Sequence, residues 1–396
     1  MLTRRNVKNG DELSILGFGC MRFPTKGAGI DEPRAIAMIR DSIEKGVNYF
    51  DTAYFYHGGK SESLLGEALS GGYRERVKIA TKLPPFMVKN LEGAKKIFAT
   101  QLTKLKTSYI DYYLLHMLSD KVTFDRMVSI GVIQWLEELK KEGKIKNLGF
   151  SFHGSKVDFE EIIQAYPWDF CQIQYNYMDE NTQATKSGLQ LAHSFGIPVV
   201  IMEPLRGGRL VNNLPEEVIQ EFKRYDEKRS PAEWALRWIW NHPEVNVVLS
   251  GMSTEAQTEE NIQIASDARA NSLSEKELEI FENVKAILHE KTKIPCTACG
   301  YCMPCPSGVN IPGCFSAYND KYLLKGKRSR WKYMQALGVM SKKPSYASVC
   351  IECGKCEKHC PQNIAIRKEL RTVKREMEGI LYRPAVKIAR KILKVE

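Results

Sequence analysis

Three strand-like segments of the sequence end in side chains that can take part in proton transfer. One ends at Asp51, with Tyr56 five residues further along the chain. The second ends at Lys82, and the third ends at His116. In a parallel α/β protein, functional groups collect at the carboxyl ends of the strands. We therefore expect an acid, a phenol, a lysine and an imidazole to meet at one mouth of the fold.

These residues and the motifs around them resemble the aldo-keto reductase superfamily. The resemblance covers roughly the first 265 residues, as for a barrel of ordinary length. It implies that Asp51, Tyr56, Lys82 and His116 form a catalytic tetrad, although a lone lysine or histidine at such a place is usually a solvated or a core residue. The motifs are Phe50-Asp51-Thr52-Ala53 followed by Tyr56, then Ser61-Glu62, Leu65-Gly66, Ala80-Thr81-Lys82, Tyr109-Ile110-Asp111 and Leu114-Leu115-His116.

The chemistry that this resemblance implies is hydride transfer to or from a carbonyl carbon. A phenol titrates near ~10, and an adjacent ammonium such as that of Lys82 favours its ionised form. Asp51 would keep that ammonium charged and in place. Tyr56 then protonates the carbonyl oxygen as hydride reaches the carbon, while His116 orients the same oxygen.

Length and composition predict a protein of two or three domains with a real core. The chain has 396 residues, of which 43% are apolar, which suits ordinary globular domains. The N-terminus is charged, and no window is long and apolar enough for a signal peptide or a membrane span, so we expect a cytoplasmic protein. Residues 291–396 carry 22 Lys and Arg against 7 Asp and Glu, whereas residues 1–290 carry 36 against 40. The basic character therefore belongs to the C-terminal part.

Strands and helices alternate eight times before residue 266. Eight such units predict a closed (β/α)₈ TIM barrel, preceded by a hairpin at residues 6–13. A doubly wound sheet is the alternative, but no Gly-x-Gly-x-x-Gly follows the first strand. The predicted strands are residues 15–19, 47–50, 77–82, 110–116, 145–150, 170–175, 198–202 and 245–250, and the predicted helices are 35–45, 61–69, 91–105, 130–141, 158–165, 182–195, 232–240 and 255–265.

The resemblance also implies a nicotinamide cofactor, NAD(P)H, at the mouth of the barrel. The loop after the eighth strand runs into a helix N-terminus, where free backbone N–H groups suit phosphates. By resemblance the contacts are Gly19, Cys20 and Met21 near the nicotinamide, Ser151 and Gln172 at its carboxamide, Met202 at the stacking position, Ser250, Gly251, Met252 and Ser253 at the phosphates, and Gln257 and Asn261 in the helix that follows.

The sequence departs from the family pattern in three ways. Phe152 replaces an amide, Met202 replaces an aromatic residue, and Gly251 and Gln257 stand where basic residues would grip a 2′-phosphate. Gln257 instead fits a capping box that begins at Thr254. We therefore expect no strong preference for NADPH over NADH. FMN is an alternative cofactor, because barrels also bind flavin phosphates near the seventh and eighth strands.

Nine of the eleven cysteines lie between residues 296 and 360, beyond a predicted helix at residues 274–291. The run Cys350-x-x-Cys353-x-x-Cys356-x-x-x-Cys360-Pro361 matches the bacterial ferredoxin signature, in which the fourth cysteine binds the other [4Fe–4S] cluster. The first run has one residue fewer before its fourth cysteine, so Cys314 is an alternative to Cys305. Zinc is the alternative metal, and Cys20 and Cys171 are not expected to be ligands. The predicted sets are Cys296, Cys299, Cys302 and Cys360 for one cluster, and Cys305, Cys350, Cys353 and Cys356 for the other.

Two basic stretches accompany the cysteines. A predicted helix at residues 322–340 contains a basic patch at 325–330, and the tail at 367–396 is basic and partly amphipathic. A solvated helix packed on the barrel is the plain interpretation. Docking to an acidic electron carrier such as ferredoxin or flavodoxin, or to an anionic membrane, is the alternative. Nucleic acid is not an expected partner, because no base-reading motif is present.

These features predict three parts: a reductase-like barrel at residues 1–290, a small α-rich ferredoxin-like 4Fe–4S domain at 291–366, and a basic helical tail at 367–396. The expected enzyme is an oxidoreductase that couples NAD(P)H-linked carbonyl or alcohol chemistry to electron transfer through two clusters. The alternatives are an NAD(P)H- or flavin-linked ferredoxin oxidoreductase, and an electron-transfer subunit whose barrel is a scaffold. The substrate cannot be read from the fold.

Overall fold

The computed structural model describes residues 1–27, 29–212, 214–297, 299–323, 329–339, 341 and 343–392. The chain packs as two compact units. The first comprises Met1–Leu205 and Ala232–Leu273, and the second comprises Arg206–Pro231 and Ser274–Glu396. This division follows packing, and the domain limits expected from the sequence stay a prediction.

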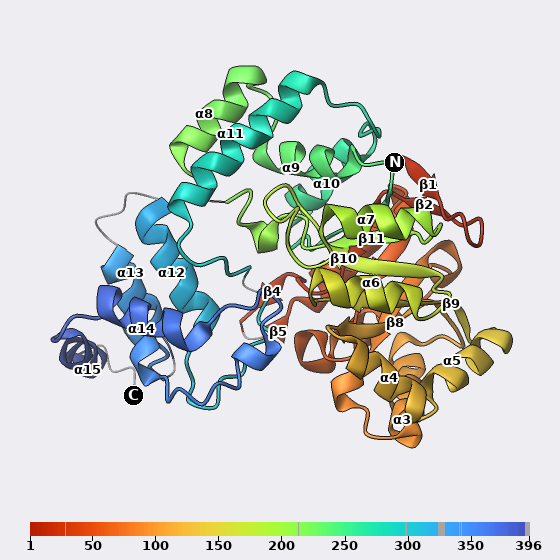
Figure 1. Cartoon of the computed structure of the whole chain (residues 1–396), viewed down its shortest axis with the longest axis horizontal. Coiled ribbons are helices and arrows are strands. Elements are labelled where there is room, and N and C mark those ends of the chain that lie inside the picture. Colours follow the sequence, from red (N-terminus) through yellow and green to blue (C-terminus); the bar gives the residue numbers. More distant parts are fainter. Residues whose placement is uncertain are drawn as a thin grey trace. The chain divides into compact units, whose positions relative to one another are not determined.

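The first unit is a closed barrel of parallel strands, as predicted (Figure 1). Its strand order is β10-β11-β12-β3-β6-β7-β8-β9, so neighbours in sequence are neighbours in the barrel and the doubly wound alternative is wrong. The strands are β3 (Leu16–Gly19), β6 (Tyr49–Asp51), β7 (Lys78–Leu83), β8 (Ile110–Leu118), β9 (Ile145–Phe152), β10 (Phe170–Gln174), β11 (Val199–Met202) and β12 (Val245–Ser250).

Helices connect these strands, and two small hairpins accompany the barrel. The predicted hairpin is present as β1 (Thr3–Arg5) and β2 (Glu12–Ser14), and a second one is β4 (Thr25–Lys26) with β5 (Gly29–Ile30). The sequence prediction missed α4, which begins where the side chain of Asp120 accepts a hydrogen bond from the N–H of Thr123. The helices are α1 (Glu32–Glu44), α2 (Ser61–Ala68), α3 (Leu91–Leu105), α4 (Lys121–Ser129), α5 (Val132–Lys141), α6 (Lys156–Gln164), α7 (Thr185–Ser194), α9 (Pro231–Trp240) and α10 (Glu255–Ala265).

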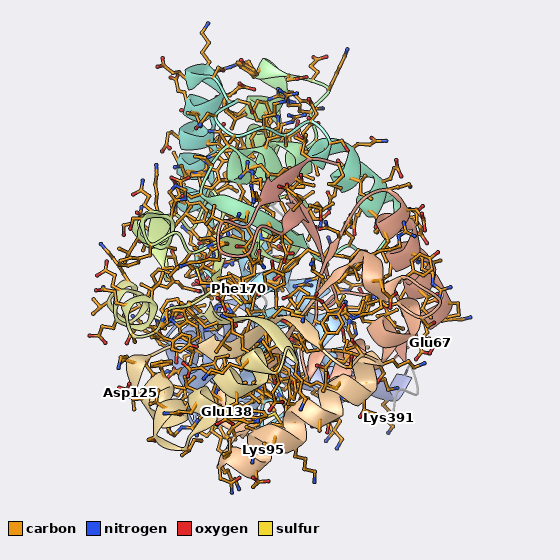
Figure 2. The ribbon with its side chains drawn as sticks, turned by 90° about the vertical axis from the view of Figure 1, so that its right-hand side faces the viewer. Glu67, Lys95, Asp125, Glu138, Phe170 and Lys391 are labelled. Carbon is orange, nitrogen blue, oxygen red and sulfur yellow. The ribbon has the colours of Figure 1, made fainter. Side chains whose placement is uncertain are left out.

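Aromatic rings fill the interior of the barrel. Tyr112 meets Tyr49 and Phe170 edge to face, with ring centroids 5.2 and 5.0 Å apart. Phe170 is fully buried, whereas Lys95 and Asp125, which Figure 2 labels, lie on outer helices. Each fully buried aromatic or aliphatic side chain contributes about 1.5–3 kcal/mol of transfer free energy. The barrel is therefore packed through its centre, which leaves its mouth as the place for a ligand.

The second unit is helical and includes a segment that the barrel prediction left unassigned. That segment forms α8 (Glu216–Tyr225), which packs on α11 (Glu275–Lys291) through the rings of Phe222 and Phe281, 6.2 Å apart. A capping box of Ser274 and Glu277 starts α11. The remaining helices are α12 (Ile311–Leu323), α13 (Ser329–Met334), α14 (Ile366–Met377) and α15 (Tyr382–Ile392).

The predicted helix at residues 322–340 is helical where the structure describes it. Residues 322 and 323 end α12, α13 follows from Ser329, and a wider π turn covers Gln335–Val339. Residues 324–328, with most of the predicted basic patch, lie outside the described residues, as do residues 393–396 of the tail. Apolar side chains from all these helices form one core, which includes Phe315, Tyr333, Leu337, Leu370, Val373 and Val386. None of the helices that the structure describes is both long and apolar enough to cross a bilayer.

Candidate functional site

Lys82 lies near the carboxyl end of β7 and is fully buried. Its Nζ donates hydrogen bonds to Oδ1 of Asp51 at 2.6 Å and to the carbonyl oxygen of Thr52 at 2.7 Å. Asp51 ends β6 and pairs with Ala80 of β7, so Lys82, two residues further along β7, faces the same side. Burial raises the pKa of Asp51 and lowers the pKa of Lys82, and the attraction between the two opposes both shifts. The lowered pKa makes Lys82 a better proton donor than an exposed lysine.

Tyr56 stands over this ion pair. It begins a short helical turn after β6, and its side chain is 7% exposed. The Nζ atom of Lys82 lies 5.0 Å from the centroid of the Tyr56 ring. The ring of His116 lies 5.9 Å away, edge to face. The four residues expected to form the tetrad therefore meet in one place.

His116 is held neutral at this mouth. Burial lowers its pKa well below the ordinary value, and the positive charge of Lys82 and the neighbouring His153 lower it further. Its ring stacks on Phe55 with centroids 4.9 Å apart, and its Nδ1 has no hydrogen-bond partner among the described residues. The β8–β9 pairing shifts register just beyond, where Met117 has φ 59. Such irregularities re-aim side chains beside active sites.

His153 belongs to the same mouth, although the sequence interpretation did not single it out. Its Nδ1 lies 3.1 Å from Oε1 of Gln183, and burial lowers its pKa to about 4. Its backbone N–H donates to the carbonyl oxygen of Leu118 at 2.9 Å, which fixes it beside the end of β8. The sequence offered a signal for this residue, because a histidine directly follows β9, much as His116 lies near the end of β8.

Phe152, which departs from the family pattern, packs in the hydrophobic core. Its side chain is fully buried and meets Phe159 of α6 at 5.1 Å and Phe150 at 6.5 Å between ring centroids. The position expected to carry an amide therefore packs against the helix layer.

The two residues expected to hold the carboxamide of the nicotinamide lie on neighbouring strands. Gln172 of β10 lies opposite Ser151 of β9 in the ladder. The hydroxyl oxygen of Ser151 accepts a hydrogen bond from the N–H of Met117 at 2.9 Å. The amide nitrogen of Gln172 lies 3.6 Å from Sδ of Met202, while its Oε1 is buried without a partner among the described residues. That oxygen is thus available to accept a hydrogen bond from a bound amide.

Gly19 and Ser250 bring the first and last barrel strands together. A Cβ at Gly19 would lie 3.2 Å from the carbonyl oxygen of Ser250, so the close approach of the two strands favours glycine. The Ser250 hydroxyl accepts a hydrogen bond from Nδ2 of Asn261 at 3.0 Å. Cys20 is buried close to the ion pair, where burial and Asp51 raise its pKa. Met21, which follows it, is 37% exposed.

The predicted capping box at the start of α10 is only half formed. The Thr254 hydroxyl accepts a hydrogen bond from the N–H of Gln257 at 3.3 Å. The side chain of Gln257 does not return to Thr254, because its Oε1 accepts from the N–H of Ser253 at 2.9 Å and from the Ser253 hydroxyl at 3.2 Å. Gln257 thus ties down the loop expected to hold phosphates and occupies one of its N–H groups.

Arg22 supplies a cation that the sequence interpretation missed. A Cβ at Gly251 would lie 3.1 Å from Cβ and Cδ of Arg22, so the stem of the arginine lies on this glycine. The aliphatic stem of an exposed arginine therefore lies against the loop after β12, although Gly251 and Gln257 carry no charge themselves.

The cysteines of the second unit fall into two groups. Cys296, Cys299, Cys302 and Cys360 line one cavity, together with apolar side chains such as Ile311 and Phe315. Burial, together with the other three thiols of this group, raises the pKa of Cys302 to about 12. In the second group, burial raises the pKa values of Cys350 and Cys356, and Cys305 contributes to both shifts.

The first group contains the four cysteines of one expected ligand set, and the second contains Cys305, Cys350 and Cys356 of the other; both ligand sets stay predictions. Among the described residues, no three or more His, Cys, Asp or Glu lie close enough together to hold one metal ion. Cys314 is buried, and its Sγ lies 3.7 Å from the Tyr333 hydroxyl and 3.8 Å from the carbonyl oxygen of Ser345. Cys171 is buried in the barrel unit with Cys20.

A buried arginine, Arg206, and a partly buried one, Arg209, lie next to the first group of cysteines. Nη1 of Arg209 donates to the carbonyl oxygen of Cys296 at 2.5 Å, and Nη2 of Arg206 donates to that of Pro295 at 3.5 Å. Nη2 of Arg209 is buried without a hydrogen-bond partner among the described residues. Both arginines come from the segment just after β11, which the sequence interpretation did not connect with the cysteines.

Comparisons with known proteins match both parts of the chain. The aldo/keto reductase family model matches residues 15–286, and the 4Fe-4S dicluster domain model matches residues 295–365. Probable aldo-keto reductase 1 of Glycine max is 29% identical over 311 residues, which cover 69% of this chain and 86% of that protein.

Solved structures agree with the barrel. The holo form of aldo-keto reductase AKR11C1 from Bacillus halodurans is 27% identical and covers 72% of this chain and 96% of its own, with a TM-score of 0.59. An aldo-keto reductase from Klebsiella pneumoniae, in complex with NADPH, has a TM-score of 0.60 with the same coverage. At 22% identity, the second likeness shows the fold alone.

Proposed function

Because the chain belongs to the aldo/keto reductase family and carries a 4Fe-4S domain, we propose that this oxidoreductase interconverts a small carbonyl compound and its alcohol at Asp51, Tyr56, Lys82 and His116. The observation that carries the proposal is the position of Lys82, whose ammonium lies between the carboxylate of Asp51 and the ring of Tyr56. A buried ammonium against a phenol is the arrangement that makes the phenol a usable acid and base at neutral pH.

Each member of the tetrad has a distinct part in the proton transfer. Tyr56 gives its hydroxyl proton to the substrate oxygen, and the buried ammonium of Lys82 stabilises the phenolate that remains. Asp51 holds that ammonium in place. His116 is neutral, so its ring can donate a hydrogen bond to the substrate oxygen without competing for the proton.

A nicotinamide cofactor fits the residues around this tetrad. When bound it would supply or accept the hydride. Oε1 of Gln172, buried and without a partner among the described residues, suits a carboxamide N–H, and Ser151 lies opposite it. Arg22 and the N-terminus of α10 suit the phosphates. This proposal rests on the chain's own residues, because the NADPH-bound relative resembles it only in fold.

We further propose that the second unit holds two [4Fe–4S] clusters that exchange single electrons with a partner. Four thiols around one largely apolar cavity suit a cluster, whose ligands are thiolates. Cys296, Cys299, Cys302 and Cys360 would hold the first cluster, and Cys305, Cys350, Cys353 and Cys356 the second. Hydride transfer moves two electrons together and a cluster moves one, so the two activities can be measured separately.

The decisive experiment compares Tyr56→Phe with Tyr54→Phe in anaerobically purified protein. The first change removes the proton-transfer hydroxyl, and the second removes a hydroxyl from a nearby ring that faces Lys104. Oxidation of NADH or NADPH should be followed with a panel of small aldehydes and ketones. We expect turnover to be lost in Tyr56→Phe and kept in Tyr54→Phe, with cofactor binding and iron content unchanged in both. Equal turnover in the two variants would remove the tetrad proposal.

A further inference from the structure

We propose that a small acidic electron-carrier protein docks on the surface formed by the loop at residues 351–355 and the exposed side of α14. This surface is called the α14 face below. The inference rests on the proposed electron-transfer role of the clusters, and it identifies which cluster meets the partner. Two independent features carry it, namely an exposed cysteine and a stripe of basic side chains.

The exposed cysteine marks the place where electrons can leave or enter. Of the eleven cysteines, all of which the structure describes, Cys353 is the one that is exposed. Ile351 beside it is 67% exposed and presents an apolar side chain to solvent. By contrast, the four cysteines of the first group are all partly buried and line a mainly apolar cavity. The cluster of Cys353 is therefore the outer of the two within this unit, with an apolar contact point at its rim.

The stripe of basic side chains comes from the sequence of α14. Ile366, Leu370, Val373 and Met377 bury one side of this helix in the core. The opposite, exposed side carries a set of five cations, and Glu376, one of the two acids of the helix, is turned toward Lys321 at 2.7 Å. The five exposed cations are Arg367, Lys368, Arg371, Lys374 and Arg375.

The two features are parts of one surface. The guanidinium carbon of Arg367 lies 3.5 Å from the position that a Cβ would take at Gly354, the residue after Cys353. Arg367 also pairs with Glu357 at 2.8 Å, and Arg371 lies 3.8 Å from Glu352. The α14 face thus borders the exposed cysteine directly.

The positive charge and the exposed cysteine of the α14 face suit an acidic protein that carries single electrons. Positive charge around a small apolar centre steers an acidic partner and orients it, and it raises the association rate more than the affinity. One electron would pass between the carrier and the outer cluster, so that one centre is oxidised as the other is reduced. No bond or proton changes in this step. A contact of this kind is small and transient, as electron-transfer interfaces usually are.

The alternative occupant of a basic helical surface is an anionic membrane. The described chain offers a separate place for that in α15, where Ile388 is 61% exposed between Lys387 and Lys391. No cysteine lies in α15, so a membrane there would have no part in electron exchange. The two helices therefore provide a matched pair of basic surfaces in one unit for the test.

The experiment compares two double charge reversals in the full-length, anaerobically purified protein. Arg371→Glu with Lys374→Glu changes the α14 face, and Lys387→Glu with Lys391→Glu changes α15. The probe is an acidic [2Fe–2S] ferredoxin, and its oxidised form is mixed with dithionite-reduced protein at several salt concentrations. We expect the α14 variant to bind at least tenfold more weakly and to lose most of the salt dependence of the electron-transfer rate, while the α15 variant matches the wild type.

Equal rates in the α14 variant and the wild type, or equal losses in both variants, would overturn the docking site. Binding to anionic vesicles but not to ferredoxin would overturn it in favour of a membrane. Reduction of a small uncharged quinone separates this result from failure of the proposed function. A wild-type protein that reduces neither quinone nor ferredoxin lacks the electron-transfer role itself, whereas quinone reduction without any preference for the α14 face rejects the docking site alone.

Discussion

Nζ of Lys82 lies 2.6 Å from Oδ1 of Asp51, and both side chains are almost completely shielded from solvent. Two charges removed from water together stabilise each other only while both are present. The pair therefore has a structural as well as a chemical role. It also has a matched counterpart, because Lys78 of the same strand pairs with Asp11 at 2.8 Å near the surface.

Replacing Asp51 should separate these two roles. Asp51→Asn leaves the buried ammonium without its carboxylate, so the free energy of unfolding should fall by about 3–5 kcal/mol. Asp11→Asn, which breaks a partly exposed pair, should lower it by no more than about 1 kcal/mol. Urea titrations of both variants measure the difference. Similar losses in the two would show that the Asp51–Lys82 pair is not a true buried ion pair.

Acid should destabilise the barrel through its buried histidines. Burial lowers the pKa of His153 to about 4, below its ordinary 6.5. Between these pH values the unfolded chain binds a proton that the folded chain does not, so stability falls as the pH falls. From pH 6.5 to 5 the loss is about 2 kcal/mol for this histidine. His153→Gln should remove that part of the pH dependence in urea titrations, whereas replacing the exposed His193 in the same way should not.

The preference for NADPH or NADH tests the effect of having uncharged residues at Gly251 and Gln257. We expect NADPH to bind no more than a few times more tightly than NADH, because neither position offers a cation for a 2′-phosphate. Arg22 lies on Gly251, so Arg22→Gln should weaken both dinucleotides, by roughly tenfold or about 1.4 kcal/mol each. Fluorescence titrations measure the four dissociation constants. A hundredfold preference for NADPH in the wild type would contradict this expectation.

Iron content tests the ligand sets. Protein isolated without oxygen should contain ~8 iron atoms per chain. Cys305→Ala should reduce the iron content and Cys314→Ala should not, because Cys314 faces Tyr333 and Ser345. Loss of iron in Cys314→Ala but not in Cys305→Ala would make Cys314 the ligand in place of Cys305. Zinc in place of iron would leave a reductase with a zinc-bound C-terminal part.

The partly buried guanidinium of Arg209 should favour reduction of the first cluster. Its hydrogen bond to the carbonyl oxygen of Cys296 holds a positive charge beside that ligand loop. Arg209→Met should shift the reduction equilibrium of one cluster about tenfold toward the oxidised form, or about 59 mV, and Arg209→Lys should restore most of it. A redox titration followed by electron paramagnetic resonance measures the two clusters separately. Equal shifts of both clusters would show that the effect is not local.

Much of this protein was predictable from its sequence. The alternation of short apolar strands and amphipathic helices predicted the barrel, and α10 was predicted with its observed limits, Glu255–Ala265. Strand ends also located Asp51, Lys82 and His116, because the carboxyl ends of parallel strands share one mouth. Cysteine spacing predicted the ferredoxin-type domain. These features are local, and local spacing alone determines them.

Tertiary structure decided what depends on contacts between distant segments. The stem of Arg22 contacts Gly251, more than 200 residues away in sequence, so two loops that the sequence does not connect meet at the mouth. The segment after β11 packs as part of the second unit, with Arg209 against Cys296, although its sequence lies within the barrel region. Gln257 caps Ser253 rather than Thr254 because side-chain hydrogen bonds follow the local geometry of a loop. Such pairings follow from where the folded chain places each atom, and no spacing in the sequence encodes them.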